Sequence, residues 1–329
     1  MRFYVAPLEG ITGYIYRNAF HEYFDSIYRD FALKRTVDKY FAPFISPGNH
    51  KKLTSKENCD VDPANNRDIC LIPQILTNDA GCFCRTAQHL YELGYTEVNL
   101  NLGCPSGTVV AKHKGAGMLE DWHQLDSFLH DIYCDRNMEI SIKTRIGMEE
   151  VDEWSEILKI FNQYPIHELI VHPRLCRDLY KGSVHMEMFA YTMEHADMPV
   201  CYNGDIFTVQ DFEHIQAEYP DLKSVMLGRG LLTNPALIRQ ILTGQSISKT
   251  EFVSFHNMIF EAYEREMSGD RNLLFKMKEL WNYWAYLFEN PDVHLKRIRK
   301  VQSKQEYAML VSNIIKYNEI SEQGYQPIG

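Results

Sequence analysis

One cysteine with two short amides nearby is the arrangement in this sequence best suited to chemistry. Residues 97–102 alternate apolar and polar side chains at period two, which predicts a strand. Gly103 then interrupts that pattern, so Cys104 is predicted on a turn beyond the carboxyl end of the strand. There a thiol can donate a proton to a substrate carbon, with Asn99 and Asn101 close by. The alternative is a buried cysteine that packs as a small apolar side chain.

Three further predicted strands carry polar side chains toward the same end. Gln74, Lys143 and His172 are expected to point toward the strands' common axis and to offer hydrogen bonds there. A lysine in such a place stabilises a negatively charged ring, because a desolvated ammonium group gains from an anionic partner. Alternatively, Lys143 and Arg145 belong to a rim of ion pairs, and His172 makes its hydrogen bonds to neighbouring protein groups.

Glycines stand next to polar residues after the last two predicted strands, in the segments 203–205 (NGD) and 228–230 (GRG). Glycines let backbone amides approach a phosphate closely, and Arg229 can neutralise its charge. Asp205 has the alternative role of capping the helix that follows. After the first strand, Pro7 and Leu8 offer tight backbone against which an aromatic ring system can lie flat.

Strand and helix patterns alternate through the first 240 residues, as in parallel strands joined by crossover helices. We count eight strand segments, at residues 3–7, 28–33 (weaker), 71–76, 97–102, 139–144, 168–172, 199–202 and 224–227. This number predicts a (β/α)8 barrel, in which chemistry occurs at the carboxyl ends of the strands and phosphate binds after strands seven and eight. The GRG segment therefore predicts a phosphorylated cofactor.

The rest of the chain is predicted as helices and loops. Helices are expected at residues 79–93 and 154–164, whereas 37–68 has no clear period and predicts a long excursion over the barrel mouth. After residue 243 the strand signals stop, and helices are expected at 252–267, 273–288 and 307–317. We therefore divide the chain into a barrel at 1–243 and an all-helical domain at 244–329.

The composition indicates an ordinary globular protein. The 329 residues include eight cysteines without the paired spacing of a zinc site or a disulfide framework, so we expect no metal and a reducing compartment. No apolar run is long enough to span a bilayer and no signal region is evident, so we expect a cytoplasmic protein with no membrane association. Nothing in the sequence implies an obligate protein partner.

A net charge of −10 argues against binding nucleic acid over the whole surface. A basic run near the carboxyl end, which contains Lys296, Arg297 and Arg299, can still form a local binding patch. Such a run is also typical of a solvated helix face.

Taken together, these residues resemble the flavin-dependent tRNA-dihydrouridine synthases. The matching segments follow one another across the barrel: 6–12 (APLEGIT), 101–106 (NLGCPS), 143–147 (KTRIG), 171–174 (VHPR), 180–182 (YKG), 203–206 (NGDI) and 226–230 (MLGRG). Residues 276–288 resemble the helical RNA-binding domain of that family.

The resemblance implies FMN in the barrel mouth, NADPH as its reductant and a tRNA substrate whose uridine becomes 5,6-dihydrouridine. It implies hydride transfer from flavin N5 to C6 of the base and a proton from Cys104 to C5. The implied cofactor residues are Pro7, Leu8, Gln74, Lys143, His172, Asn203, Gly204, Asp205, Gly228 and Arg229. The implied substrate residues are Asn101, Arg145, Tyr180, Lys296, Arg297 and Arg299.

Two departures from the family pattern concern the choice of uridine: Pro173 stands where the family usually has glycine, and residues 115–119 (GAGML) vary the loop after the cysteine. A barrel flavoenzyme acting on a free pyrimidine, a synthase acting on ribosomal RNA and a non-catalytic RNA-binding protein are the alternatives. The sequence leaves open the uridine position, the choice between NADPH and NADH, and the oligomeric state.

Overall fold

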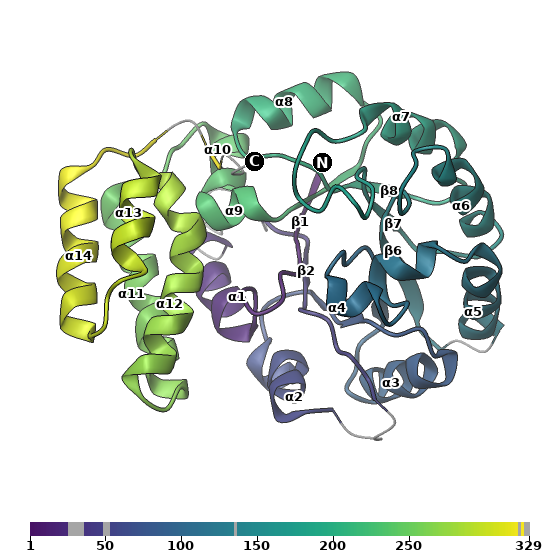
Figure 1. Ribbon diagram of the computed structural model, residues 1–329, viewed down its shortest axis with the longest axis horizontal. Helices are drawn as coiled ribbons and strands as arrows, with labels where there is room; N and C mark the ends of the chain where they lie inside the picture. The colour runs from purple at the N-terminus through teal and green to yellow at the C-terminus, as the bar shows by residue number, and fades with distance from the viewer. Residues whose placement is uncertain (26–35, 49–52, 135–136, 322–323, 326–329) are drawn as a thin grey trace.

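Nine parallel strands form a nearly closed barrel (Figure 1). The computed structural model describes residues 1–25, 36–48, 53–134, 137–321 and 324–325. The strands are β1 (Arg2–Val5), β2 (Lys39–Phe41), β3 (Leu71–Ile72), β4 (Gln74–Ile75), β5 (Glu97–Leu102), β6 (Glu139–Arg145), β7 (Leu169–His172), β8 (Val200–Tyr202) and β9 (Ser224–Leu227). Their order is β3-β2-β1-β9-β8-β7-β6-β5-β4. Only Pro73 separates β3 from β4, so the two ends of the sheet meet there and the third predicted strand is split in two.

The period-two pattern of the strands sorts the side chains inside the barrel into layers. An apolar middle layer is buried, and its members include Tyr4, Phe41, Ile72, Ile170, Cys201 and Met226. Below it, at the amino-terminal end, Lys39 contacts Glu97 at 2.7 Å and Glu168 at 3.5 Å. These ion pairs and the apolar layer fill the lower barrel, which leaves the carboxyl end for a ligand.

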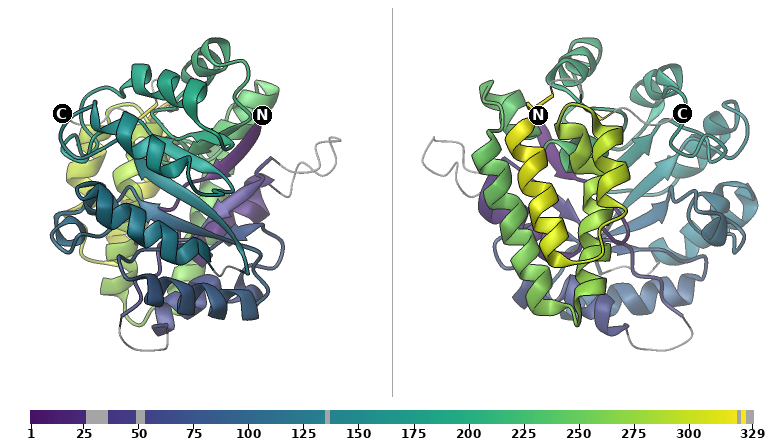
Figure 2. Two further views of the ribbon diagram at one scale, coloured as in Figure 1. Left: turned by 90° about the vertical axis from the view of Figure 1, so that its right-hand side faces the viewer. Right: turned by 60° about the vertical axis from the view of Figure 1, so that its left-hand side comes forward.

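Helices surround the barrel, as Figures 1 and 2 show. In the barrel part they are α1 (Tyr14–Phe20), α2 (Ser55–Val61), α3 (Ala80–Glu92), α4 (Gly107–Val110), α5 (Trp122–Cys134), α6 (Glu153–Phe161), α7 (Met186–His195), α8 (Val209–Glu218), α9 (Arg229–Thr233) and α10 (Leu237–Thr243). Both predicted helices of this part are confirmed within a few residues, at α3 and α6. The apolar residues of α6, spaced three and four apart, are buried against the barrel.

The second strand of the barrel was not predicted correctly. The segment expected at 28–33 lies outside the described residues, and the second position in the barrel is taken by β2. The interpretation of residues 37–68 as one long loop was therefore wrong, because this stretch holds both β2 and α2. Three residues are too few to display a period, and α2 depends on a capping box between Thr54 and Glu57 more than on an apolar face.

Four helices follow the barrel: α11 (Lys249–Glu266), α12 (Asp270–Trp284), α13 (Pro291–Ile298) and α14 (Lys304–Tyr317). Three of them match the predicted segments, whereas α13 was missed because it is short, with only three buried side chains. The right-hand view of Figure 2 shows α14 and its neighbours side by side at one flank of the barrel. The ring of Phe255 in α11 lies 5.9 Å from that of Tyr16 in α1, so these helices share one core with the barrel. The boundary at 243 remains a prediction.

Candidate active site

The carboxyl ends of the strands surround a cavity of about 700 Å³. Each part of the barrel wall contributes a side chain or backbone to it, because the residue two positions beyond the middle layer points inward again. Fourteen predicted site residues line it: Pro7, Leu8, Gln74, Asn101, Cys104, Lys143, Arg145, His172, Tyr180, Asn203, Gly204, Asp205, Gly228 and Arg229. The three predicted cations of α13 are not among its lining residues.

The turn that carries Cys104 is fixed from two sides. Asn101 ends the inward face of β5, and its Oδ1 accepts hydrogen bonds from the amides of Gly103 at 3.1 Å and Cys104 at 3.0 Å. Arg145 on the neighbouring strand donates from Nε to the Gly103 carbonyl at 3.1 Å. Cys104 is half-buried and faces the cavity, so its thiol has a defined position and access to a ligand.

Side-chain amides connect this turn to the floor of the cavity. Asn101 donates to Gln74 Oε1 at 2.8 Å, and Gln74 Nε2 donates to Asn99 Oδ1 at 2.8 Å. Asn99 in turn donates to Ser141 at 3.0 Å. All four side chains are buried, and their bonds fix the orientation of each amide. Within the described parts of the chain, Gln74 and Asn101 each have one amide N–H left for a ligand.

Lys143 places an ammonium group in the cavity wall. It stands on β6 directly beside Asn101 of β5. Among the described residues, the Lys143 ammonium group has no hydrogen-bond or ion-pair partner. Desolvation and the charge of the nearby Arg145 lower its pKa to about 8. An anionic ligand would relieve both effects.

His172 is held neutral in the cavity wall. Its Nε2 lies 3.1 Å from Nη1 of Arg174, which can only donate, so Nε2 is the acceptor and the proton of the neutral ring sits on Nδ1. Burial, followed by the charges of Arg145 and Lys143, lowers the pKa of His172 well below its ordinary value. The ring can therefore present an N–H donor to a ligand.

Charged and small residues meet where β8 and β9 end. Asp205 accepts hydrogen bonds from Arg174 Nη1 at 3.0 Å and Arg229 Nη2 at 2.6 Å, so one carboxylate holds two guanidinium groups. Position 204 must be glycine, because a Cβ there would lie 1.9 Å from the Tyr202 hydroxyl. The backbone is thus exposed to a ligand beside two arginines, which suits a phosphate group.

The loop between β7 and α7 is tied down over the cavity by two buried arginines. Arg145 donates to the carbonyls of Leu175, at 2.6 Å, and Leu179. Arg174 donates to the carbonyls of residues 181 and 182 at 3.3 and 2.5 Å. These bonds hold Tyr180 at the mouth, where about half of its side chain is exposed. The Arg145 guanidinium is therefore engaged with backbone carbonyls on all three of its nitrogens.

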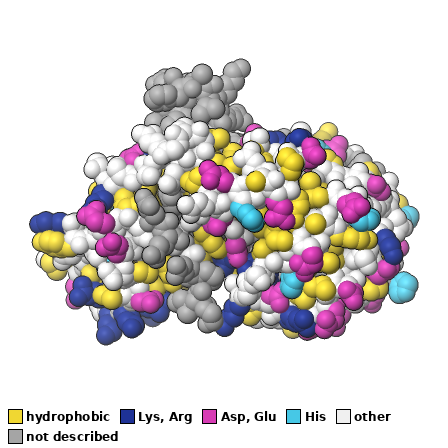
Figure 3. Space-filling model, turned by 90° about the horizontal axis from the view of Figure 1, so that it is seen from above, with side chains coloured by type: hydrophobic (Ala, Val, Ile, Leu, Met, Phe, Trp, Pro, Cys, Tyr) yellow, Lys and Arg dark blue, Asp and Glu magenta, His cyan; other side chains and the backbone are white. Residues whose placement is uncertain are grey.

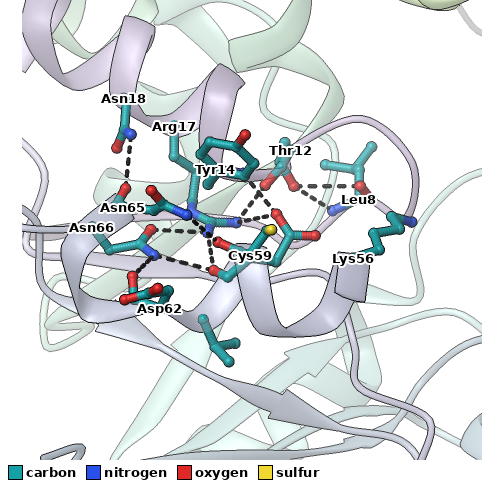
Figure 4. Close-up of polar contacts among 12 residues, drawn as sticks. Leu8, Thr12, Tyr14, Arg17, Asn18, Lys56, Cys59, Asp62, Asn65 and Asn66 are labelled. Carbon is teal, nitrogen blue, oxygen red and sulfur yellow. Dashed lines mark hydrogen bonds and ion pairs between the residues drawn. The ribbon is translucent and has the colours of Figure 1, made fainter. Parts of the chain in front are cut away.

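A buried arginine also fixes the loop that carries Pro7 and Leu8 (Figure 4). Arg17 of α1 donates to the Thr12 carbonyl at 2.8 Å and to Asn66 Oδ1 at 2.9 Å. The Thr12 hydroxyl accepts a hydrogen bond from the Leu8 amide at 2.8 Å. The loop is thereby tied to the segment after α2 and keeps its shape at the edge of the cavity.

The predicted basic residues lie outside the cavity, on α13 and at Arg299, which directly follows it. Lys296, Arg297 and Arg299 are exposed, and among the described residues they have no acidic partner. Figure 3 shows Lys and Arg side chains gathered at the end of the molecule formed by the carboxyl-terminal helices. Lys296, Arg297 and Arg299 are exposed cations that can attract a polyanion.

Several lining residues escaped the sequence analysis. Phe207 follows the NGD segment, Tyr283 lies on α12, and Tyr325 comes from beyond the last helix. Arg174 was noticed only within a matching segment, although it holds both His172 and Asp205. None of these side chains lies on a strand, so the strand pattern could not reveal them.

The charge of the site fits a flavin nucleotide. Three cations, Lys143, Arg145 and Arg229, line the cavity together with two carboxylates. Asp205 pairs with Arg174 and Arg229, and Glu9 pairs with Lys56 at 2.8 Å. The net positive charge matches a phosphate and a ring that becomes anionic on reduction. Within the described residues, no cluster of three or more His, Cys, Asp or Glu side chains is placed to hold a metal ion.

Comparison with known proteins identifies the class. The family model described as Dihydrouridine synthase (Dus) matches residues 4–319. The tRNA-dihydrouridine(16) synthase of Pseudomonas syringae pv. tomato is 31% identical over 174 residues, which are 52% of this chain and 55% of that protein. The tRNA-dihydrouridine(16) synthase of Neisseria meningitidis serogroup A is 25% identical over 328 residues, 94% of each chain. The match to the Pseudomonas protein thus spans about half of that relative's length.

The chain belongs to the dihydrouridine synthase family. A solved structure, of a variant of NCR from Zymomonas mobilis, has a TM-score of 0.50 and 10% identity over 75% of this chain and 88% of its own. That likeness concerns the barrel fold. No helix in the described part of the chain is long and apolar enough to cross a membrane.

Proposed function

We propose that this protein is an FMN-dependent tRNA-dihydrouridine synthase that takes its reducing equivalents from NADPH. The observation that carries the proposal is one cavity in which a half-buried thiol, Cys104, and the ammonium group of Lys143, unpaired among the described residues, face the same space. The family match and the names of the relatives support the class of substrate.

Each side of the cavity has a role in holding FMN. Pro7 and Leu8 would border the ring, and Gln74 and His172 would donate hydrogen bonds to it, His172 from its Nδ1–H. Lys143 would stabilise negative charge on the reduced ring. The phosphate group would be held by the residues that end β8 and β9, namely Asn203, Gly204, Asp205, Gly228 and Arg229.

When bound and reduced, the flavin supplies a hydride from N5 to C6 of uracil. Negative charge then develops across the base, and Cys104 donates its thiol proton to C5. The C5–C6 double bond becomes a single bond with one hydrogen added at each carbon, and the thiolate regains a proton from solvent. Asn101 holds the turn of Cys104 and keeps one N–H for the base.

The uridine must leave its stack to enter the cavity. Tyr180 offers a half-exposed ring at the mouth against which a base can stack. Arg145 would support this substrate site through its bonds to the carbonyls on either side, in the Cys104 turn and the Tyr180 loop.

A tRNA substrate accounts for the carboxyl-terminal helices. Lys296, Arg297 and Arg299, on α13 and directly after it, would neutralise RNA phosphates within residues 244–329, whereas an enzyme for a free pyrimidine would have no use for them. Both relatives described above are named for position 16, which makes that uridine the first to examine.

The test is Cys104→Ser with an unmodified tRNA and NADPH. We expect the wild type to add two hydrogens to one uridine, located by mass spectrometry. The variant should bind FMN and accept electrons from NADPH normally, but form product about 10²–10⁴-fold more slowly because a hydroxyl is a weaker acid. Cys134→Ser, at an exposed cysteine on α5, is the control. Product formation by the Cys104 variant at the wild-type rate, or no product from the wild type, would refute the proposal.

A further inference from the structure

Three aromatic rings enclose Arg229, and each comes from a different part of the chain. The guanidinium carbon lies 5.2 Å from the ring centre of Tyr180, 5.3 Å from that of Phe207 and 5.4 Å from that of Tyr325. Only 13% of the Arg229 side chain is exposed. A cation over the face of a ring is attracted by the ring's electrons, and more strongly when water is excluded.

Two of these rings are themselves fixed by packing. Phe207 and Tyr325 lie 5.5 Å apart between ring centres, and Tyr325 also packs against Tyr286 at 4.8 Å and Tyr283 at 5.9 Å. Tyr283 belongs to α12, and Tyr286 lies in the short turn of helix that follows it. The position of Tyr325 therefore depends on the carboxyl-terminal helices as well as on the barrel.

The backbone beside Tyr325 is shaped for this contact. Gly324 has a φ of +67°, and a Cβ there would lie 2.9 Å from the Phe207 carbonyl oxygen, so only glycine fits. A few residues earlier, the amide of Ser321 donates to the Leu287 carbonyl at 2.8 Å. The chain thus returns from α14 along the end of α12 to reach the cavity.

Among the described residues, Arg229 has hydrogen-bond donors without a partner. One of its five N–H groups reaches Asp205 at 2.6 Å, and a second approaches the Tyr180 carbonyl at 3.4 Å. An arginine side chain in water would lose much rotational freedom on binding a phosphate. The rings and the carboxylate remove that freedom beforehand, which makes binding more favourable.

We propose that Phe207 and Tyr325 are positioning residues for the phosphate group of the cofactor: they hold Arg229 in the orientation that binds it. This inference rests on the proposed function, because it takes FMN as the ligand of the cavity. It assigns a role in cofactor selection to a residue from beyond the last helix.

The experiment compares FMN with riboflavin, which lacks the phosphate group. Dissociation constants are measured with the full-length apoprotein by flavin fluorescence. We expect Tyr325→Ala and Phe207→Leu to weaken FMN binding about five- to tenfold and to leave riboflavin binding unchanged. Tyr325→Phe should bind FMN like the wild type, since the ring remains. Tyr317→Ala removes a tyrosine that is 70% exposed on α14 and serves as the matched control.

A double substitution shows whether the rings act through Arg229 or contribute to FMN binding simply by lining the cavity. In an Arg229→Gln background, Tyr325→Ala should cause no further loss of FMN affinity, because the group it positions is gone. Equal losses for FMN and riboflavin, an additional loss in the Arg229→Gln background, or unchanged FMN affinity in both single variants would each overturn the inference. A wild type that binds neither flavin would instead overturn the proposed function, and the inference with it.

Discussion

Lys143 illustrates how a single residue adapts the barrel to an anionic ligand. The period-two pattern of β6 places it inside, and the same pattern brings Arg145 into the cavity two positions later. Desolvation disfavours the charged form of Lys143, and repulsion by Arg145 on the same side of the strand adds to the cost, so the pKa of Lys143 falls to about 8. The free protein therefore carries an electrostatic cost that an anion removes.

This pKa predicts a pH dependence of cofactor binding. Lysine is charged below its pKa, so the ammonium form of Lys143 is lost as pH rises through about 8. We expect the FMN affinity of the apoprotein to fall above that pH, by at most about tenfold per pH unit. Lys143→Gln should bind FMN more weakly at pH 7 and show no such fall. A wild-type affinity that stays constant up to pH 9.5, roughly one and a half units above the pKa, would contradict this account.

The sequence predicted cavity residues on the strands and in the matching motifs at their ends, and it missed others that lie in a loop or beyond the last helix. Gln74, Lys143 and His172 follow from alternation, because a strand of known direction assigns each side chain to one face. Phe207 and Tyr325 reach the cavity from a loop and from beyond α14, where only tertiary packing decides the position. Local patterns carry no information about such contacts.

At the scale of the elements, substitutions on α13 test whether its positive charge contributes to tRNA binding. Replacing Lys296, Arg297 and Arg299 by alanine should raise the KM for tRNA by roughly tenfold or more at low salt and lower its salt dependence by about one unit per charge. Oxidation of NADPH by the flavin should not change. Lys159→Ala is the control, because this exposed lysine lies on α6, on the opposite side of the molecule (Figure 1). An unchanged KM would remove α13 from the RNA-binding surface.

A buried histidine makes the carboxyl-terminal helices sensitive to acid. Trp281 donates to the Tyr307 hydroxyl at 2.9 Å, and His256 contacts that hydroxyl through Nε2 at 2.7 Å and Asn257 Oδ1 through Nδ1 at 3.0 Å. Because the amide oxygen only accepts, Nδ1 carries the proton of the neutral ring and Nε2 accepts from Tyr307. Burial lowers the pKa of His256 to about 4, compared with about 6.5 in an unfolded chain. The unfolded state therefore binds more protons between these values, and stability falls as pH drops below 6.5.

The expected size of this effect is about 2 kcal/mol of unfolding free energy between pH 7 and pH 5. Urea unfolding at the two pH values should show a smaller loss for His256→Gln than for the wild type, because glutamine does not titrate yet retains an acceptor for Tyr307. Equal losses in the two proteins would show that His256 is not the titrating group.

The prediction of elements succeeded where the pattern was long. The six residues of β5 and the nine of α6 display their periods clearly, and both were predicted. The three-residue β2 was not, since its place depends on pairing with β1 and β3 across the barrel. The charged helix α13 was missed for a related reason: three buried side chains are too few to define an apolar face.

At the scale of the whole molecule, the core joins the barrel to the helices that follow it. Phe255 of α11 is fully buried and packs on Tyr16 and on Phe24, whose ring centre is 5.0 Å away. Lys276 of α12 donates to the Gly10 carbonyl in the loop at the cavity. Cutting the chain after residue 243 would expose this core, so point substitutions test the carboxyl-terminal part better than truncation does.

A shared core predicts a single unfolding transition. Circular dichroism and tryptophan fluorescence should report the same urea midpoint. Phe255→Ala should lower the unfolding free energy by about 3–5 kcal/mol through the cavity it creates. Phe275→Ala, at a side chain 66% exposed on α12, is the control and should change little. Two separate transitions would show that residues 1–243 and 244–329 fold independently.

The most direct measurement of the central claim is an anaerobic single turnover. The holoenzyme is reduced with NADPH, freed of excess nucleotide and mixed with unmodified tRNA. We predict that the visible absorbance of the oxidised flavin returns and that one uridine per flavin gains two hydrogens. For Cys104→Ser the flavin should stay reduced over the same period. A wild-type flavin that remains reduced, with every uridine unchanged, would contradict the account.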